Sequence, residues 1–175
     1  MSGRNNGKNH VLYRRLENSV STLHPWERRI FIDTEFTDIA APCLISLAMV
    51  AEDGPEFYAE HAHVDRDTCS AFVQANVLPQ LGADPARVME RAALRESVRS
   101  WMSMFTGLKQ RPVICYDYPV DVQLLWELVG GRITGWKEKL IRSRIDPVTK
   151  EGYFRVHGGR HHALHDARAN RAAYR

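Results

Sequence analysis

One short stretch, RRIFIDTEFTD at residues 28–38, constrains the fold more than any other part of the chain. Its apolar centre, IFI at 30–32, predicts a buried strand over 29–36, and two acids, Asp33 and Glu35, lie at the end of that strand. Side chains two apart in a strand share a face, so both carboxylates point the same way. They repel one another there unless a cation lies between them or one of them is protonated.

An oxygen-only pair of ligands favours a hard cation, Mg²⁺ or Mn²⁺, over zinc. The alternative is an exposed strand end where both acids meet water, and the D-x-E pattern alone does not decide between the two. The three cysteines, Cys43, Cys69 and Cys115, are widely spaced and form no CxxC pair. They therefore support neither a structural zinc site nor a disulfide framework.

The size and composition of the chain predict one globular domain. The chain has 175 residues, with 44% hydrophobic and 26% charged residues, which is enough apolar material for a sizeable core. Residues 1–25 are expected to form a polar and basic extension with a short helix near 11–20, and 26–175 a single domain. The sequence contains no apolar run of about 20 residues and its first residues do not resemble a signal peptide, so we expect a cytoplasmic protein.

Hydrophobic periodicity predicts an α/β fold. Three strands are expected to form a meander, because Asp53-Gly54 is a hairpin signal between the second and the third, and a fourth strand follows later. The expected strands are 29–36, 44–54, 56–64 and 111–118. Apolar residues at helical spacing predict helices at 70–81, 85–107, 120–131, 136–143 and 162–175.

Basic residues are concentrated in one segment. Residues 137–160 hold seven Lys or Arg and three Asp or Glu, a net charge of +4, whereas the whole chain carries +3. A local basic segment beside acids elsewhere suits an enzyme that acts on a phosphate polymer. The alternative interpretation is a solvated loop.

Two further stretches carry chemistry. In YDYPVDVQLLWEL, Asp121 falls in the first turn of a helix just after a strand, where an acid is also favoured by the helix dipole alone. In GGRHHALHDARAN, a glycine pair precedes His161 and His162, and Asp166 follows early in the last helix. With His157 and His165 this makes four histidines within nine residues, which indicates a transition-metal site or a general base.

Taken together, FIDTEFT, YDYPVD and HHALHDA resemble, in order, the three motifs of the DEDDh 3′–5′ exonucleases, a superfamily that includes RNase T, oligoribonuclease and proofreading subunits. DTEF, LISLAMVAEDGPEFYAE and VLPQL are similar to a subgroup of small bacterial exoribonucleases known from a mycobacterial member. The resemblance implies the RNase H-like α/β fold, with a mixed five-stranded sheet and helices on both faces. The fifth strand would lie within 144–157, near 153–156.

The resemblance also implies the roles of individual residues. Asp33, Glu35 and Asp166 would hold one divalent cation, Mg²⁺ or Mn²⁺, and Asp121 would support a second one beside Asp33. His161 would deprotonate the attacking water, and the product would be a nucleoside 5′-monophosphate.

The implied substrate is the 3′ end of RNA. The residues expected to bind the terminal nucleotide are Phe36, Thr37, Tyr116 and His162. Phe36 would contribute its ring, and backbone N–H groups at 36 and 37 would bind the 3′-hydroxyl. The basic segment 137–160 would follow the phosphates.

Two positions stay ambiguous. Tyr116 and Asp117 replace the usual His-Asn of the second motif, so Asp117 is an alternative to Asp121 as a ligand. In the third motif the family spacing selects His161 as the base, although His162 lies four residues before Asp166 on the same helical face.

Other readings remain open. His61, His63 and Asp65 share a strand face and form a second candidate metal site, for which a solvated edge is the alternative. The alternative functions are a 3′–5′ exonuclease on DNA and a catalytically silent RNase H-like module that binds nucleic acid. A homodimer is compatible with the resemblance.

Overall fold

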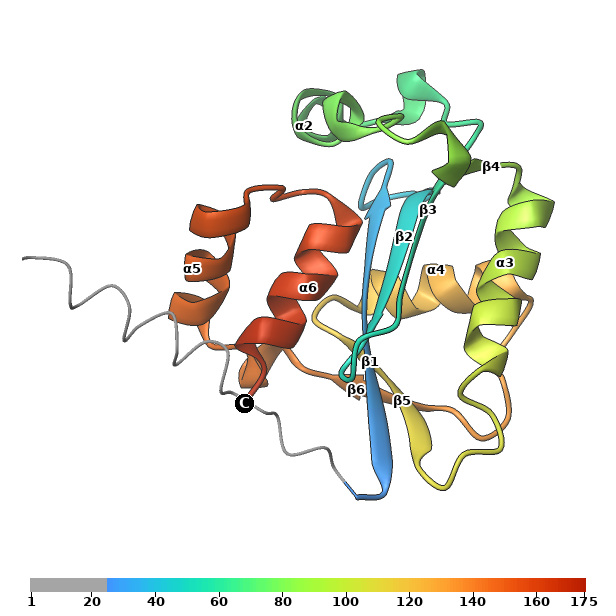
Figure 1. The fold of residues 1–175 in the computed structure, drawn as a ribbon. Helices are drawn as coiled ribbons and strands as arrows, with labels where there is room; N and C mark the ends of the chain where they lie inside the picture. Colours follow the sequence, from blue (N-terminus) through green and yellow to red (C-terminus); the bar gives the residue numbers. More distant parts are fainter. Residues whose placement is uncertain (1–24) are drawn as a thin grey trace, which may run out of the picture.

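The computed structural model describes residues 25–175, so the helix expected near 11–20 lies outside the described residues. Within this range the chain forms a mixed sheet with the strand order β4-β3-β2-β1-β5-β6 (Figure 1). The strands are β1 (Glu27–Phe36), β2 (Leu44–Ala51), β3 (Glu56–His61), β4 (Val88–Met89), β5 (Arg111–Tyr116) and β6 (Lys137–Leu140). The predicted α/β class is therefore confirmed, with six described strands rather than five.

The pairing of the strands follows the predicted meander. β1 pairs antiparallel with β2, and β2 pairs antiparallel with β3. β5 returns to the other edge of β1 in parallel, and β6 pairs in parallel with β5. β1 and β5 therefore end at the same edge of the sheet, so the motifs that follow them meet there.

Two predicted elements are wrong. Residues 136–143 were expected to form a helix, because Lys, Glu and Leu favour helices, but 137–140 form the edge strand β6. Residues 153–156, where the fifth strand was expected, instead form part of the helix α5 (Pro147–His157). α5 forms because Asp146 accepts a hydrogen bond from Thr149 N and Pro147 occupies the first turn, whereas the polar β6 depends on its pairing with β5.

The helices cover both faces of the sheet, as predicted (Figure 1). α6 (Ala163–Ala173) packs on β1 and β2, and α5 packs on α6. α3 (Arg91–Ser103) and α4 (Pro119–Val129) cover the opposite face. The remaining helical segments are α2 (Ala71–Asn76) and short 3-10 turns at Arg66–Thr68, Leu78–Gln80, Pro85–Arg87 and Arg142–Arg144.

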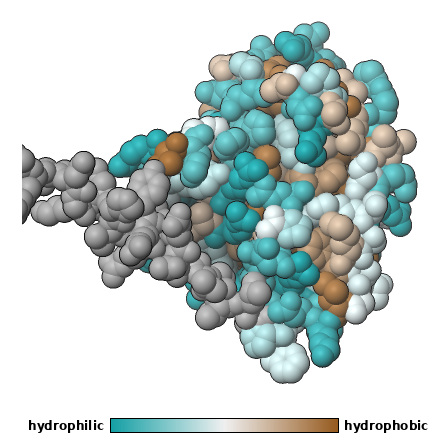
Figure 2. Space-filling view, viewed as in Figure 1, coloured by the Kyte–Doolittle hydropathy of each residue, from teal (hydrophilic) through white to brown (hydrophobic). Residues whose placement is uncertain are grey.

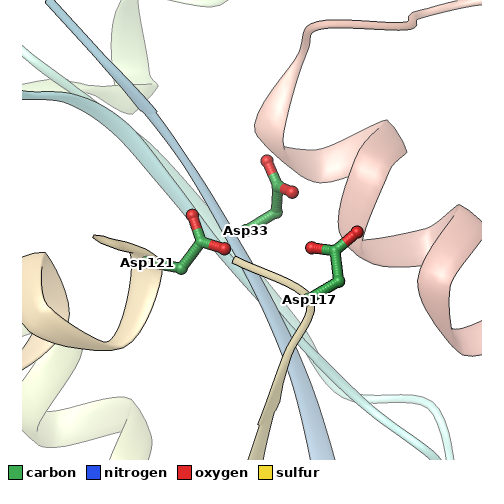
Figure 3. A group of neighbouring side chains, drawn as sticks. All are labelled: Asp33, Asp117 and Asp121. Carbon is green, nitrogen blue, oxygen red and sulfur yellow. The ribbon is translucent and has the colours of Figure 1, made fainter. Parts of the chain in front are cut away.

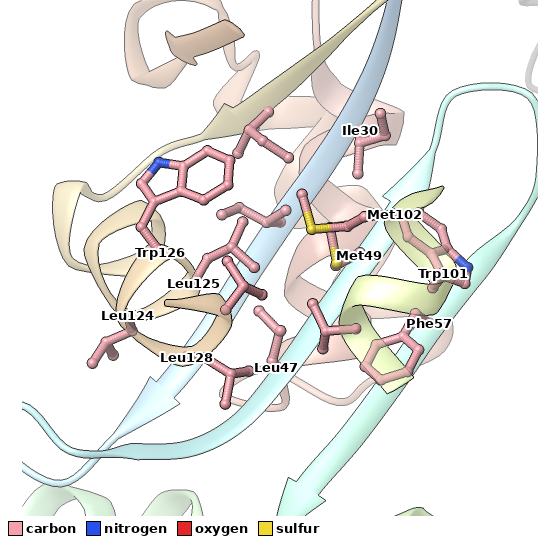
Figure 4. Close-up of a cluster of buried hydrophobic side chains, with 14 of the residues drawn as sticks. Ile30, Leu47, Met49, Phe57, Trp101, Met102, Leu124, Leu125, Trp126 and Leu128 are labelled. Atoms are coloured by element: carbon pink, nitrogen blue, oxygen red, sulfur yellow. The ribbon is translucent and has the colours of Figure 1, made fainter. Parts of the chain in front are cut away.

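The main core lies between the sheet and the helices α3 and α4 (Figure 4). Ile30 and Ile32 of β1 point into it, with Leu125 and Leu128 of α4 and Met102 of α3. On the other face, Ala163 and Ala167 of α6 pack on Ala48, Val50 and Tyr58. Alanine at these positions lets α6 lie close to the sheet, which brings Asp166 near β1.

The surface seen in the direction of Figure 1 is largely hydrophilic, with apolar side chains scattered over it (Figure 2). Among residues 25–175, no helix combines the length and the apolar character that crossing a bilayer requires.

Candidate functional site

The candidate site lies at the carboxyl end of β1, between the first turns of α4 and α6. Strand alternation sends Ile30 and Ile32 into the main core and leaves Asp33 and Glu35 on the face that α6 covers. In the sheet, Asp33 pairs with Ala48, which contacts α6. The strand is therefore anchored by its apolar half, while its two acids face the helix that carries Asp166.

Two overlapping groups of acids form at this point. Carboxylate oxygens of Asp33, Glu35 and Asp166 lie within 4.8 Å of one another, and so do those of Asp33, Asp117 and Asp121. Asp33 belongs to both groups, and Figure 3 shows its carboxylate between those of Asp117 and Asp121. The structure thus brings together all four acids that were expected to hold metal, and Asp117, the alternative ligand of the second motif, lies with them.

Asp121 is fixed from one side only. Its Oδ1 accepts hydrogen bonds from Thr34 N at 3.2 Å and from Thr34 Oγ1 at 2.8 Å. The residue is 2% exposed, and its Oδ2 has no hydrogen-bond partner among the described residues. A buried carboxylate oxygen without a donor is costly. Together with the all-oxygen donor set, this orphan oxygen fits a hard divalent cation at the site.

Asp117 is instead held by two basic side chains, those of Lys150 and Arg142. Its carboxylate Oδ2 lies 2.9 Å from Lys150 Nζ, and its backbone carbonyl accepts a hydrogen bond from Arg142 Nε at 3.0 Å. Both Asp117 and Asp121 reach Asp33, so geometry alone does not exclude either as a ligand. They differ in their partners, because Asp117 is paired with an ammonium and Asp121 retains an unsatisfied oxygen.

Burial and mutual repulsion disfavour the charged forms of these acids. Burial raises the pKa of Asp33 well above its ordinary value, and the charges of Asp121 and Asp166 raise it further. Burial, followed by the charge of Asp166, raises the pKa of Glu35 to about 8. Burial also raises the pKa of Asp121 to about 7 and that of Asp166 to about 6. A bound cation would relieve this repulsion.

His161 lies in the loop between α5 and α6. It has a φ of 62°, a positive value that is rare outside glycine. Its ring packs edge-on against Phe72 at 4.8 Å between centroids. Burial, and then the charge of Arg160, lower the pKa of His161 below its ordinary value. The imidazole is therefore neutral at pH 7, the state in which it can accept a proton.

The loop that carries His161 is tied down from a distant part of the chain. Gln80 Nε2 lies 2.9 Å from the carbonyl oxygens of both Arg160 and His161. On the other side of the loop, Gly159 lies against the ring of His165, with no room for a side chain. These contacts fix the backbone just before Asp166.

His162 has a different environment from the one expected. Its ring stacks on Tyr58 at 4.6 Å and lies 5.3 Å from the ring of His165. Its backbone N–H donates to Asp166 Oδ2 at 3.1 Å. His162 therefore packs on β3 and positions the Asp166 carboxylate, and its role toward substrate stays a prediction.

Phe36, one of the aromatic residues expected to meet substrate, directly follows Glu35 on β1 and is partly buried against the main core. Phe36 stacks on Tyr118, with 6.3 Å between centroids and 9° between the ring planes. The guanidinium of Arg142 lies over the other ring, 5.5 Å from the centroid of Tyr118. Tyr116, at the end of β5, is half-buried against the main core.

Thr37 differs from its prediction in one respect. Its backbone N–H donates to Cys43 O at 3.0 Å, and its hydroxyl bonds to Ala41 O and Cys43 N. In this conformation the N–H is therefore engaged in the 37–43 loop rather than available to a 3′-hydroxyl.

The second candidate metal site, at His61, His63 and Asp65, does not assemble. His61 Nδ1 lies 2.8 Å from the carbonyl of His63, and His63 Nε2 pairs with Glu90 at 2.7 Å. These histidines line an open cavity of about 390 Å³ beside Thr37. Within residues 25–175, the groups of three or more candidate ligands are the two acid groups at β1.

The basic side chains of segment 137–160 make two kinds of contact, some away from the site and some with Asp117 at the site. Lys137 pairs with Glu27, and Arg160 pairs with Glu151. Lys150 and Arg142 instead reach Asp117 at the site. The sequence pattern placed Arg142 and Lys150 only in the basic segment and Tyr118 only within the stretch YDYPVD, and it gave no role to Gln80. The contacts of Arg142, Lys150 and Gln80 at the site are with residues distant in sequence.

The chain has the RNase H-like fold, which it shares with a nuclease of known structure. The crystal structure of cell-death related nuclease 4 superimposes with a TM-score of 0.55, covering 85% of this chain and 62% of that one at 16% sequence identity. At this identity the likeness shows the fold alone.

In sequence, the chain is similar to two curated proteins from two strains of Mycobacterium tuberculosis, each named 3′–5′ exoribonuclease. Each is 39% identical over 72 residues, which are 41% of this chain. The predicted resemblance is confirmed over this part. The match spans 41% of the length of these relatives, so their activity is a proposal for this chain. No protein-family model matches the chain.

Proposed function

We propose that the chain is a divalent-metal-dependent 3′–5′ exoribonuclease that releases nucleoside 5′-monophosphates. The observation that carries this proposal is the double acid group centred on Asp33, in which the buried Oδ2 of Asp121 lacks a donor within the described residues. An arrangement that could hold cations, at the sheet edge of an RNase H-like fold, supports hydrolysis at phosphorus. The printed names of the two mycobacterial relatives support RNA as the substrate and the 3′ end as the start.

Asp33, Glu35 and Asp166 would hold one cation, and Asp33 with Asp121 would hold a second one. When bound, such cations stabilise the charge that develops on the attacking and leaving oxygens of a displacement at phosphorus. The role of the acids themselves would be to hold the cations and to fix their positions. Thr34 keeps Asp121 in place through its two hydrogen bonds, and His162 N–H does the same for Asp166.

His161 would act as the general base. Its neutral imidazole would take a proton from the attacking water, whose oxygen then bonds to phosphorus while the bond from phosphorus to the 3′ oxygen of the penultimate nucleotide breaks. The leaving oxygen takes a proton from solvent. Gln80 and Gly159 would keep His161 within reach by fixing the loop.

Phe36 and Tyr118 would form the platform for the terminal nucleobase, since aromatic faces stack on every base. Arg142 would extend that platform with a positive charge. Tyr116, Thr37 and His162 stay predictions as substrate contacts. A cytoplasmic location, a single domain over 26–175 and a homodimer are also predictions.

The test is the degradation of a 5′-labelled single-stranded oligoribonucleotide in Mg²⁺ or Mn²⁺. We expect a ladder that shortens from the 3′ end, a monophosphate product and loss of activity in EDTA. Asp33→Asn should reduce the rate at least 1,000-fold, a loss of about 4 kcal/mol in transition-state stabilisation. The matched control is Asp38→Asn, a partly exposed acid of the adjacent loop whose Oδ1 accepts a hydrogen bond from Ala40 N at 2.8 Å, which should keep the wild-type rate.

The same oligonucleotide with 2′-deoxyribose separates the alternatives. A clear preference for DNA would replace RNA as the proposed substrate. Binding of either oligonucleotide without cleavage under any divalent cation would favour a silent binding module.

A further inference from the structure

An additional acid and a lysine form a pair inside the candidate site. Asp117 stands where the resembled motif has asparagine, so this chain carries one carboxylate more in the group Asp33–Asp117–Asp121. Lys150 Nζ lies 2.9 Å from Asp117 Oδ2. Both side chains are largely shielded from solvent, at 23% and 21% exposure, so the ammonium adds one positive charge beside the extra negative one.

The position of Lys150 is fixed by its place in a packed helix of the fold. It lies in the first turn of α5, where its N–H donates to Asp146 O at 3.0 Å. Asp146 itself is fixed to the end of α6, through its N–H to Ala173 O at 2.8 Å and its carboxylate to Arg175 at 2.8 Å. α6 also carries Asp166. Lys150 and Asp166 are therefore parts of one packed unit.

The charge of Lys150 reaches the other acid group as well. Burial raises the pKa of Asp166, and the Lys150 ammonium is the largest opposing influence. In the group Asp33–Asp117–Asp121, Asp121 is 2% exposed and its Oδ2 has no partner among the described residues, so this group has room for a positive partner.

We propose that Lys150 is a tethered cation of the site: its ammonium, held by Asp117, balances the group Asp33–Asp117–Asp121 and competes with a second divalent ion there. This proposal rests on the proposed function, because it assumes that the acids bind divalent cations. Asp117 is then a positioning residue for Lys150. The group Asp33–Glu35–Asp166 takes the tightly bound ion, and the second ion binds weakly until substrate phosphate adds negative charge.

The test measures Mn²⁺ binding without nucleic acid, by calorimetry and by the electron paramagnetic resonance of unbound Mn²⁺. Lys150→Met removes the charge and keeps the length of the side chain. We expect the second Mn²⁺ to bind at least tenfold more tightly than in the wild type. Lys137→Met is the matched control, because it breaks the ion pair with Glu27 at the other end of β6 and should leave both affinities unchanged.

A charge-restoring variant makes the test specific. Lys150→Met combined with Asp117→Asn replaces the ion pair by two neutral side chains, so the second affinity should return to within about threefold of the wild type. Circular dichroism and thermal unfolding verify that each variant is folded, and Lys150→Gln replaces the methionine variant if that one does not fold.

Unchanged or weaker Mn²⁺ binding in Lys150→Met would overturn the proposal. A double variant that binds as tightly as Lys150→Met would also overturn it, because charge balance would then not be the cause. If no protein bound Mn²⁺, both this proposal and the metal dependence of the proposed function would fail. A tighter second site supports the proposal even if the wild type degrades no RNA, so the two failures are distinguishable.

Discussion

Thr34 and Asp121 show how two buried hydrogen bonds from one residue support the site. Thr34 is 4% exposed and donates from both its N–H and its hydroxyl to the same carboxylate oxygen. The hydroxyl opposes the rise that burial causes in the pKa of Asp121. β1 thus carries two candidate ligands, Asp33 and Glu35, and it positions a third, Asp121 on α4, through Thr34, which lies between them.

Thr34→Val removes the hydroxyl and keeps the shape of the side chain. We expect the free energy of unfolding at pH 8 to fall by about 1–3 kcal/mol, because a buried, ionised carboxylate loses a donor. Chemical denaturation measures this change. Thr106→Val, at an exposed position, is the control and should change it by less than about 0.5 kcal/mol. An equal effect of both substitutions would contradict the role given to Thr34.

Gln80 ends the 3-10 turn that follows α2, and its side-chain amide bonds to the loop that carries His161. Gln80→Leu removes two hydrogen bonds to the loop, so the imidazole should lose its fixed position and kcat should fall about tenfold with little change in KM. Gln123→Leu, which loses a hydrogen bond to Glu127 on the exposed side of α4, is the matched control. A change in KM alone would instead place Gln80 in substrate binding.

At the scale of elements, the loop between α5 and α6 is the part most sensitive to added bulk. Gly158 and Gly159 both have positive φ values, 65° and 73°. A Cβ at Gly159 would lie 2.3 Å from His165 Cγ, whereas a Cβ at Gly158 would meet no described atom within 4 Å. Gly158 also has a ψ of −152°, a combination that only glycine adopts readily, so its backbone cost is not a match for that of Gly159. Gly107, with φ 75° and no described atom within 4 Å of an added Cβ, is the comparison for Gly159.

Gly159→Ala should thus destabilise the protein by about 1–3 kcal/mol more than Gly107→Ala, because it adds a steric clash to the strain of a positive φ. It should also reduce kcat, since the displaced loop carries His161. Thermal unfolding and single-turnover kinetics measure the two effects. Equal destabilisation by the two alanines would mean that His165 moves away at no cost.

Sequence periodicity predicted the elements that have an apolar pattern and missed those that depend on partners. β1, β2 and β5 are apolar strands, and α4 begins with a proline, Pro119, in its first turn, so the edge where the acids meet was predictable. KEKL at 137–140 has a helical composition and becomes β6 only beside β5. The pairing of Asp117 with Lys150, 33 residues apart, depends on the docking of α5 and left no trace in a motif.

At the scale of the whole molecule, the acid group links stability to pH. Glu35, Asp121 and Asp166 have pKa values raised from their ordinary 4.5, 3.8 and 3.8 to about 8, 7 and 6. Between about pH 4 and pH 8 the folded, metal-free protein therefore holds more protons at these groups than the unfolded chain. Their contribution to stability is fully present below pH 4 and is lost as the pH rises through 8.

We expect saturating Mg²⁺ to raise the unfolding temperature more at pH 8 than at pH 5, because the cation replaces those protons. The comparison is made in EDTA and in Mg²⁺, with wild type and Glu35→Gln. The variant should lose less stability than the wild type between pH 5 and pH 8 in EDTA. The difference between the two proteins isolates the acid group from the histidines, whose lowered pKa values act in the opposite direction.

The central claim is that the end of β1 is a divalent cation site, and anomalous diffraction from crystals soaked in Mn²⁺ with a nucleoside 5′-monophosphate tests it most directly. The account predicts a Mn²⁺ peak bounded by Asp33, Glu35 and Asp166, with the phosphate of the nucleotide beside it and its base near Phe36. The absence of a peak at these acids, or a peak only at His61 and His63, would contradict the account.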